Sequence, residues 1–210
     1  MCRYTEGETV DDLRKILDQA HAAREAALAK TRQIIQLSSK SIRATHRQEF
    51  DSATELLAKA KALGADVSES LRPYPALFYA GYLQDSLKEV VEAACLLAII
   101  RHEELPTHTE LGVEVTTYLH GLAEAASEVR RYVLDQMRKG SQQEAENLLG
   151  FMENVYDELI SFDYPDGLTG GLRRTTDALR AVVERTRSDL EVTLMQRELI
   201  DALKQASNSE

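Results

Sequence analysis

The first part of the chain lacks both of the residues that most often interrupt a helix. No proline or glycine occurs between Thr9 and Leu63. Apolar residues recur there at intervals of three and four, which is the spacing of one face of an α-helix. Nowhere does the sequence show the strict apolar–polar alternation that is typical of a half-buried strand. The sequence therefore predicts an all-α protein.

We expect an antiparallel bundle of about six or seven helices. The expected helices cover approximately residues 9–38, 40–62, 76–101, 109–139, 142–160 and 168–204. Three serines near residue 40 are weak helix formers and predict a break there. Gly64 is expected to end the second helix, and Ser141-Gln-Gln-Glu144 to open the fifth with a capping box. The last region is expected to be interrupted near Gly170 and Gly171.

The chain is predicted to form one domain over residues 1–210, with residues 1–8 and 205–210 frayed. No uncharged apolar stretch is long enough for a membrane span, so no membrane contact is expected. The acidic N-terminus lacks the apolar region of a secretory signal. The two cysteines, Cys2 and Cys95, provide no disulfide framework. These features predict a cytoplasmic location.

Charge is distributed unevenly along the chain. The net charge of −10 argues against a protein that binds nucleic acid over its whole surface. Residues 30–47 nevertheless contain several cations and no acid, and Lys40, Arg43 and Arg47 share one helix face. Arginines suit bidentate contacts with phosphate, so these three residues are candidates for binding RNA through its backbone. The alternative is a solvated face whose cations pair with nearby acids.

Residues 79–100 are expected to form one helix with an apolar second half. Glu89 and Glu92 lie at the edge of the apolar run, and their spacing of three places them one turn apart on one face. Asp85 extends this acidic stripe. Because an unpaired buried carboxylate is costly, the pair requires a cationic partner, a raised pKa or a metal. The residues alone leave a structural salt bridge and a functional site equally open.

Two further predicted helices carry acids at helical spacing. Glu124 and Glu128 are four residues apart, as are Glu153 and Asp157. If a face of each converged on the central pair, the carboxylates would need a cation, and oxygen ligands suit Mg²⁺ or Mn²⁺. Such a site could activate water for cleavage of a phosphodiester. The structural alternative places Glu124 on a solvated face and pairs Glu128 with an arginine.

Two other classes of all-α metalloprotein have sequence motifs that can be sought in this chain. Ferritin-like di-iron bundles need Glu-x-x-His motifs. None of the five histidines has a glutamate three residues before it, so a di-iron oxidase is not expected. All-α nucleotide pyrophosphatases use an E-x-x-E followed by an E-x-x-D, and Glu89-Val-Val-Glu92 supplies the first half of that pair. A pyrophosphatase is therefore kept as a third candidate.

Four stretches, in their order along an all-α chain, resemble the translin family. Within that family the resemblance is to the branch of the translin-associated factor X and its archaeal relatives. The stretches are Leu37–Arg47, Ala80–Gly81 with Lys88–Ala93, Tyr118–Arg131, and Asn154–Leu159 running on through Tyr164–Leu168 into Leu172–Arg174. They cover about residues 30 to 200, which is nearly the whole chain.

The resemblance implies a function as well as a fold. It implies a helical bundle, eight copies of which assemble into a closed octamer. The octamer would be a Mg²⁺-dependent endoribonuclease that cleaves single-stranded RNA inside its cavity. Glu89, Glu92 and Asp157 match the catalytic and metal-binding acids of the branch, and Glu128 matches a further acidic position. A homo-oligomer is the simplest assembly, with the basic stretch lining its interior. The alternative is a non-catalytic oligomer that binds RNA or single-stranded DNA.

Overall fold

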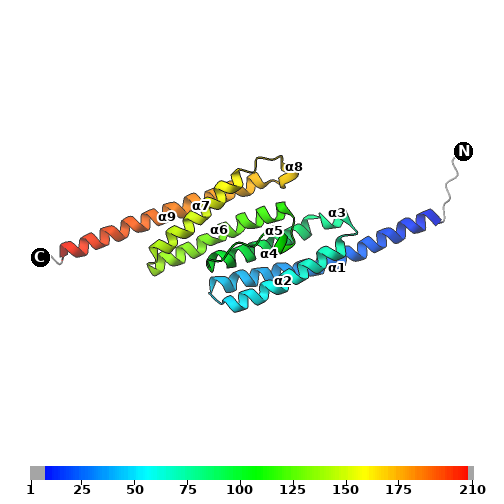
Figure 1. Ribbon diagram of the computed structural model, residues 1–210, viewed down its shortest axis with the longest axis horizontal. Helices are drawn as coiled ribbons and strands as arrows, with labels where there is room; N and C mark the ends of the chain where they lie inside the picture. The colour runs from blue at the N-terminus through cyan, green and yellow to red at the C-terminus, as the bar shows by residue number, and fades with distance from the viewer. Residues whose placement is uncertain (1–7, 208–210) are drawn as a thin grey trace.

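The computed structural model describes residues 8–207, and within them it contains helices and no strands. Six long helices build the fold (Figure 1): α1 (Glu8–His46), α2 (Phe50–Leu71), α4 (Gly81–Ile100), α6 (Val115–Lys139), α7 (Gln142–Ile160) and α9 (Leu172–Ser207). Three four-residue helices lie in the connections: α3 (Pro75–Phe78), α5 (His108–Leu111) and α8 (Asp166–Thr169). The all-α prediction and the expected number of long helices are confirmed. The interruption between α8 and α9 occurs where two glycines predicted it.

Helix α4 lies at the centre of the bundle. It packs against α1 and α2 on one side and against α6 on the other, while α7 and α9 cover the far side of α6. Its sequence explains this position, because every residue from Ala93 to Ile100 is buried. Within this run the side chains of Cys95 and Leu96 are fully enclosed. A helix that is apolar on all sides is stable only inside other helices.

The predicted break near residue 40 is wrong, because α1 continues through the serines to His46. Ser38 and Ser41 are buried instead of exposed. The hydroxyl of Ser41 donates a hydrogen bond of 2.8 Å to the carbonyl of Ala53 in α2. Small side chains let α1 and α2 pack closely, and this tertiary contact outweighs the weak helix propensity of serine.

Gly64 does not end α2, which continues to Leu71. A Cβ atom at Gly64 would lie 2.9 Å from Cδ2 of Leu87 on α4. This glycine therefore permits a close helix contact, and the expectation of a C-cap is wrong.

The predicted capping box at Ser141 is also absent, since the Ser141 side chain makes no capping hydrogen bond. Glu144 instead forms an ion pair of 3.3 Å with His102. A capping box does occur at the start of α5, between Thr107 and Glu110.

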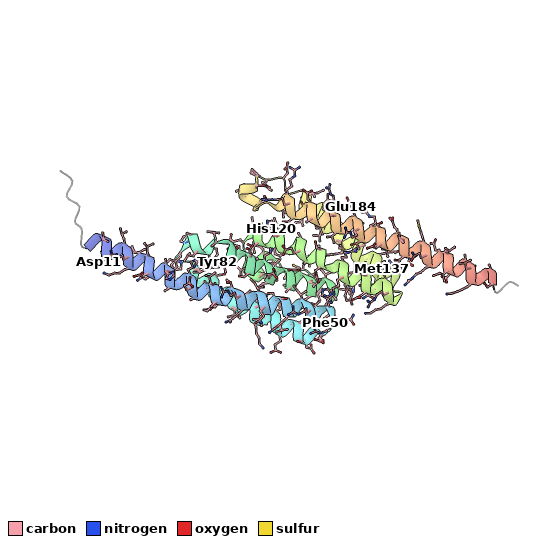
Figure 2. All side chains as sticks on the ribbon, turned by 180° about the vertical axis from the view of Figure 1, so that it is seen from behind. Asp11, Phe50, Tyr82, His120, Met137 and Glu184 are labelled. Atoms are coloured by element: carbon pink, nitrogen blue, oxygen red, sulfur yellow. The ribbon has the colours of Figure 1, made fainter. Side chains whose placement is uncertain are left out.

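Two helix ends extend beyond the bundle on opposite sides. These are the first turns of α1, where Figure 2 labels Asp11, and the last turns of α9. Residues 1–7, which include Cys2, and 208–210 lie outside the described part, so the expected fraying concerns mainly those residues; residues 205–207 continue α9. Within residues 8–207, no helix combines the length and apolar character needed to span a bilayer.

The contact between α4 and α6 depends on one glycine. A Cβ atom at Gly121 would lie 2.5 Å from Cβ of Val91 and 2.9 Å from the carbonyl oxygen of Lys88. Real Cβ atoms do not approach other atoms so closely. Gly121 therefore sets the separation of α4 and α6, and it lies one turn before Glu124 on the same helix face.

We predict that Gly121→Ala destabilises the fold. Overpacking of a tight contact costs about 1–3 kcal/mol, which exceeds the gain of up to about 1 kcal/mol that alanine brings to a helix. The matched control is Gly150→Ala in α7, where no atom lies within 4 Å of the added Cβ atom. In urea denaturation Gly121→Ala should lower the midpoint, and Gly150→Ala should leave it unchanged or raise it. Equal midpoints for the two variants would contradict this account of the α4–α6 contact.

Candidate metal centre

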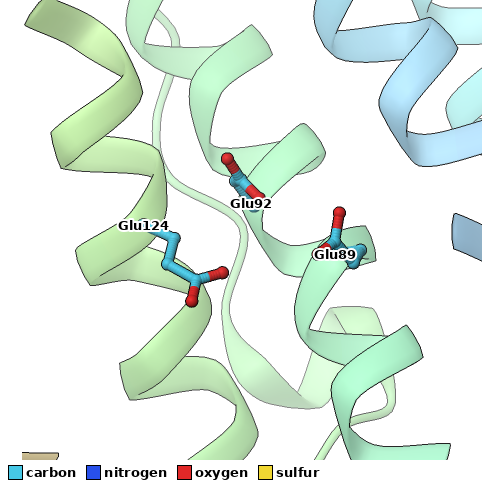
Figure 3. Close-up of side chains that lie close together, drawn as sticks. All are labelled: Glu89, Glu92 and Glu124. Carbon is cyan, nitrogen blue, oxygen red and sulfur yellow. The ribbon is translucent and has the colours of Figure 1, made fainter. Parts of the chain in front are cut away.

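Three carboxylates meet at the contact between α4 and α6. Glu89 and Glu92 project from α4, and Glu124 reaches toward them from α6 (Figure 3). One oxygen atom from each lies within 4.8 Å of the other two. Two ligands of one Mg²⁺ lie at most about 4.2 Å apart, so small rotations of these side chains would bring all three oxygens onto one cation.

Local sequence explains how these side chains meet. Glu89 and Glu92 are one turn apart on the face of α4 that adjoins α6. Glu124 follows Gly121 by three residues, so the close contact at the glycine brings this carboxylate across to α4. The interpretation of Glu124 as a solvated surface residue is wrong, because its side chain is only 35% exposed and faces the other acids.

The group carries more negative charge than its surroundings balance. Burial raises the pKa of Glu92 to about 8, and the charges of Glu89, Glu124 and Glu128 add to this effect. The pKa of Glu89 is also raised, first by burial and then by Glu124. No residue that the structure describes gives Glu89 or Glu92 a hydrogen bond or an ion pair. These two half-buried acids therefore lack the cationic or hydrogen-bonding partner that withdrawal from water makes necessary.

Among the described residues, Lys88 supplies the only ammonium group close to the negative charge of Glu89, Glu92 and Glu124. Its Nζ lies 2.6 Å from Oε1 of Glu124. Burial acts to lower the pKa of Lys88, but the hydrogen bond and charge of Glu124 outweigh it, and the pKa is raised. Lys88 is thus held as a cation beside the three carboxylates.

A histidine from α1 contacts the next acid along α6. Nε2 of His46 lies 2.6 Å from Oε1 of Glu128, and the His46 side chain is 2% exposed. Its other ring nitrogen, Nδ1, is buried without a hydrogen-bond partner. Glu128 is therefore paired with His46 and not with the arginine that the sequence suggested. It also brings the C-terminal end of α1 beside the acidic group.

The donor set fits Mg²⁺ or Mn²⁺. All three ligating groups are carboxylates, which are hard oxygen donors, and neither histidine nor cysteine belongs to the group that the structure describes. A divalent cation would provide the positive charge that Glu89 and Glu92 lack.

Asp157 is not a member of this group. It is exposed on α7, which packs against α6 and α9. Its predicted helix partner Glu153 accepts a hydrogen bond of 2.7 Å from Arg187 on α9. This face of α7 thus adjoins α9, and the assignment of Asp157 rests on the family resemblance alone. Gly121, three residues before Glu124, is the sequence signal for the close helix packing that brings this acid into the group.

The three predicted RNA-binding residues are exposed, Lys40 and Arg43 in the last two turns of α1 and Arg47 in the turn that follows it. Arg43 donates a hydrogen bond of 2.8 Å to Ser39 on its own helix. Arg47 donates two hydrogen bonds to the carboxylate of Glu49, so its charge is already paired. Lys40 makes no hydrogen bond or ion pair with the residues that the structure describes. Arg47 therefore fits the interpretation that these cations pair with nearby acids. Lys40 fits the interpretation that they bind the RNA backbone.

The pyrophosphatase alternative needs an E-x-x-D on a helix beside the E-x-x-E. After Glu92 such a pattern occurs only once in the sequence, at Glu198 to Asp201. It lies in the exposed last turns of α9, which extend beyond the bundle (Figure 1). The geometry does not bring this pattern to α4.

Comparison with known proteins reveals relatives over most of the chain. A model described as the translin family matches residues 9–188. The uncharacterized protein MJ0175 of Methanocaldococcus jannaschii is 32% identical over 189 residues, which cover 87% of this chain and 82% of that protein. A structure of AfC3PO in complex with duplex RNA is 33% identical with a TM-score of 0.82, covering 90% of this chain and 98% of the other. The structure of apo-NeC3PO, 22% identical with a TM-score of 0.80, covers 92% of this chain and 100% of the other and shares the fold.

We predict that Glu92 makes the metal-free protein less stable as the pH rises. Folding raises the pKa of Glu92 from 4.5 to about 8, so between these values the folded state binds more protons than the unfolded state. The unfolding free energy therefore falls as the pH rises through this range. Glu92→Gln removes the titrating group, so its melting temperature should match wild type near pH 5 and exceed it by roughly 4 °C at pH 9.

Thermal denaturation of both proteins in EDTA from pH 5 to pH 9 measures this difference. Adding Mg²⁺ at pH 9 should raise the melting temperature of wild type more than that of Glu92→Gln. Parallel melting curves across the whole pH range would contradict the burial of an unbalanced acid at this position.

Proposed function

This chain belongs to the translin family, and we propose that it is a divalent-metal-dependent endoribonuclease that cleaves single-stranded RNA. The observation that carries the proposal is the meeting of Glu89, Glu92 and Glu124 within 4.8 Å at the α4–α6 contact. Salt bridges that only stabilise a fold pair their charges, whereas this group leaves two carboxylates without a hydrogen-bond partner among the described residues. Such uncompensated, half-buried acids are typical of functional sites.

The relatives support a nucleic-acid substrate. AfC3PO, 33% identical to this chain over nearly its whole length, has been solved in a complex with duplex RNA. We infer that this chain binds RNA as well. The choice of single-stranded RNA as the cleaved form comes from the family resemblance described above.

The three carboxylates would hold Mg²⁺ or Mn²⁺. The cation would act as a Lewis acid, lowering the pKa of a water molecule and neutralising charge on the scissile phosphate. Glu92 must lose its proton to serve as a ligand, and a divalent charge close to it favours that loss. Glu128, which His46 holds by a 2.6 Å contact, lies one turn beyond Glu124 and is the nearest further acid on α6.

The basic face of α1 provides a path for the RNA backbone. Arg43 is three residues before His46 and shares its side of the helix. His46 contacts Glu128, so this side of α1 adjoins the helix that carries Glu124. Cations beside an acidic site can hold phosphates that the acids would otherwise repel. We therefore assign Lys40 and Arg43 to backbone binding, with Arg47 contributing less because Glu49 pairs it.

We further propose that the protein is a homo-oligomer, with an octamer as the form that the resemblance implies, in the cytoplasm. The projecting ends of α1 and α9 carry apolar side chains that are exposed in the single chain. These are Leu13, Ile16 and Leu17 on α1, and Val192, Met195, Leu199, Ile200 and Leu203 on α9. Their helical spacing forms apolar stripes, which other copies of the chain would bury.

The second candidate function is a non-catalytic oligomer that binds RNA or single-stranded DNA. The related AfC3PO–RNA complex is equally compatible with it. Binding that persists in EDTA, without cleavage under any divalent metal, would favour this alternative.

We predict that cleavage of a single-stranded RNA requires Mg²⁺ or Mn²⁺ and is abolished by EDTA. Glu89→Gln, Glu92→Gln and Glu124→Gln should each lower the rate by about 100-fold or more, because each removes one charged ligand. Cleavage of a labelled RNA under single-turnover conditions provides the measurement. The control is Glu158→Gln, an exposed carboxylate of α7, which should cleave at the wild-type rate.

Asp157→Asn separates the two assignments of the third ligand. The geometry predicts a rate within about twofold of wild type, whereas the resemblance alone predicts a loss as large as that of Glu89→Gln. Full activity of Glu124→Gln together with an inactive Asp157→Asn would overturn the site described above.

We predict that Arg43→Ala weakens RNA binding similarly for all sequences. A lost phosphate contact should lower the slope of log K against log salt concentration by about 0.7 for a single strand. Fluorescence anisotropy at several salt concentrations measures this slope. The control is Arg72→Ala, which should leave the slope unchanged, because this arginine just after α2 is already paired with Glu69. An unchanged slope for Arg43→Ala would exclude this arginine from the interface.

A further inference from the structure

Lys88 lies between two polar features of the α4–α6 contact. On one side its Nζ contacts Glu124 at 2.6 Å, and its side chain is 23% exposed. On the other side Lys88 lines a cavity of about 220 Å³. The other residues around this cavity are Gln84, Asp85, Thr116, Thr117, His120 and Gly170.

The cavity has walls that are already fixed by hydrogen bonds. Thr117 donates to the side-chain oxygen of Gln84 at 2.6 Å, and the Gln84 amide donates to the carbonyl of Phe78 at 2.8 Å. Both ring nitrogens of His120 are engaged, one by Thr175 and one by the carbonyl of Thr169. Lys88 is the only ammonium or guanidinium group around the cavity. It is also free to change partner, because a flexible chain attaches its charge to α4.

Lys88 contacts the same carboxylate, Glu124, that a metal ion at this site would use. Oε1 of Glu124 is the atom that the ammonium contacts. A divalent cation held by all three acids would draw on the charge of Glu124 and repel the ammonium at short range. A displaced ammonium at a half-buried position is stabilised by an anion beside it, in addition to the Asp85 carboxylate that lines the same cavity. The cavity that Lys88 already lines is the adjacent space where such an anion can lie.

We propose that Lys88 contacts the substrate when metal is bound. Without metal, its ammonium pairs with Glu124; metal binding breaks this pair, and the ammonium then binds a phosphate of the RNA at the cavity beside the metal centre. The ammonium offers three donors and a compact charge, which suits a single phosphate oxygen. In the metal-free protein the same group partly neutralises the carboxylates. This inference rests on the proposed metal-dependent function and adds a coupling between metal and RNA binding.

The coupling can be measured with a cleavage-resistant probe, a 2′-O-methyl phosphorothioate single strand. In wild type, Mg²⁺ should raise the affinity for this probe about tenfold relative to EDTA. Lys88→Gln should bind the probe in EDTA within about twofold of wild type and should lose most of the gain from Mg²⁺. Lys88→Arg, which keeps the charge, should retain at least part of it.

Calorimetric titration with Mn²⁺ in the absence of RNA provides the second measurement. Lys88→Gln should bind the metal about fivefold more tightly than wild type, because the internal competitor is gone. The matched control is Lys59→Gln. Lys59 also contacts a glutamate, Glu55, at 2.6 Å, but on the exposed face of α2, so both affinities should be unchanged.

The outcomes separate this inference from the function on which it rests. If wild type binds metal and cleaves RNA, but Lys88→Gln keeps the full gain from Mg²⁺ or binds Mn²⁺ no more tightly, the role of Lys88 is overturned and the nuclease stands. If wild type binds no divalent metal, both the role of Lys88 and the metal-dependent nuclease are excluded. A folded Lys88→Arg that retains the coupling, beside a Lys88→Gln that loses it, supports the proposal even if Lys88→Gln is less stable.

Discussion

The close contact of α4 and α6 at Gly121 is the constraint on which the rest of the structure depends. No side chain separates the two helices there, and Val91 and the backbone of Lys88 occupy the space that a Cβ atom would need. The acids that follow on each helix are consequently brought together across the contact. The packing that completes the core therefore also assembles the candidate site.

The electrostatic cost of this arrangement is local. The apolar half of α4 buries Glu92, and three neighbouring acids oppose its ionisation. Lys88 and His46 each contact one acid of α6, which leaves the two acids of α4 without a hydrogen-bond partner among the described residues. A fold selected for stability alone would remove such charges, since buried carboxylates without partners are destabilising. A bound divalent cation would offset this cost, and in the proposed nuclease it would also serve catalysis.

The sequence predicted the helical class, the central position of α4 and the acidic pair Glu89 and Glu92, because apolar periodicity and helix spacing carry that information. It did not predict the continuity of α1 or the membership of Glu124. Both depend on contacts between helices: Ser41 bonds to α2, and Glu124 reaches α4 past a glycine. Local propensity cannot reveal such contacts. Asp157, assigned by resemblance, lies on α7, which packs against α6 and α9 and does not carry a member of the acidic group.

In the proposed nuclease, one divalent cation binds between α4 and α6. Anomalous diffraction from crystals soaked in Mn²⁺ tests it most directly, because the peak locates the ion independently of any activity. The account predicts one strong peak with carboxylate oxygens of Glu89, Glu92 and Glu124 at about 2.1 Å. A peak beside Asp157, or no peak between these helices at saturating Mn²⁺, would contradict it.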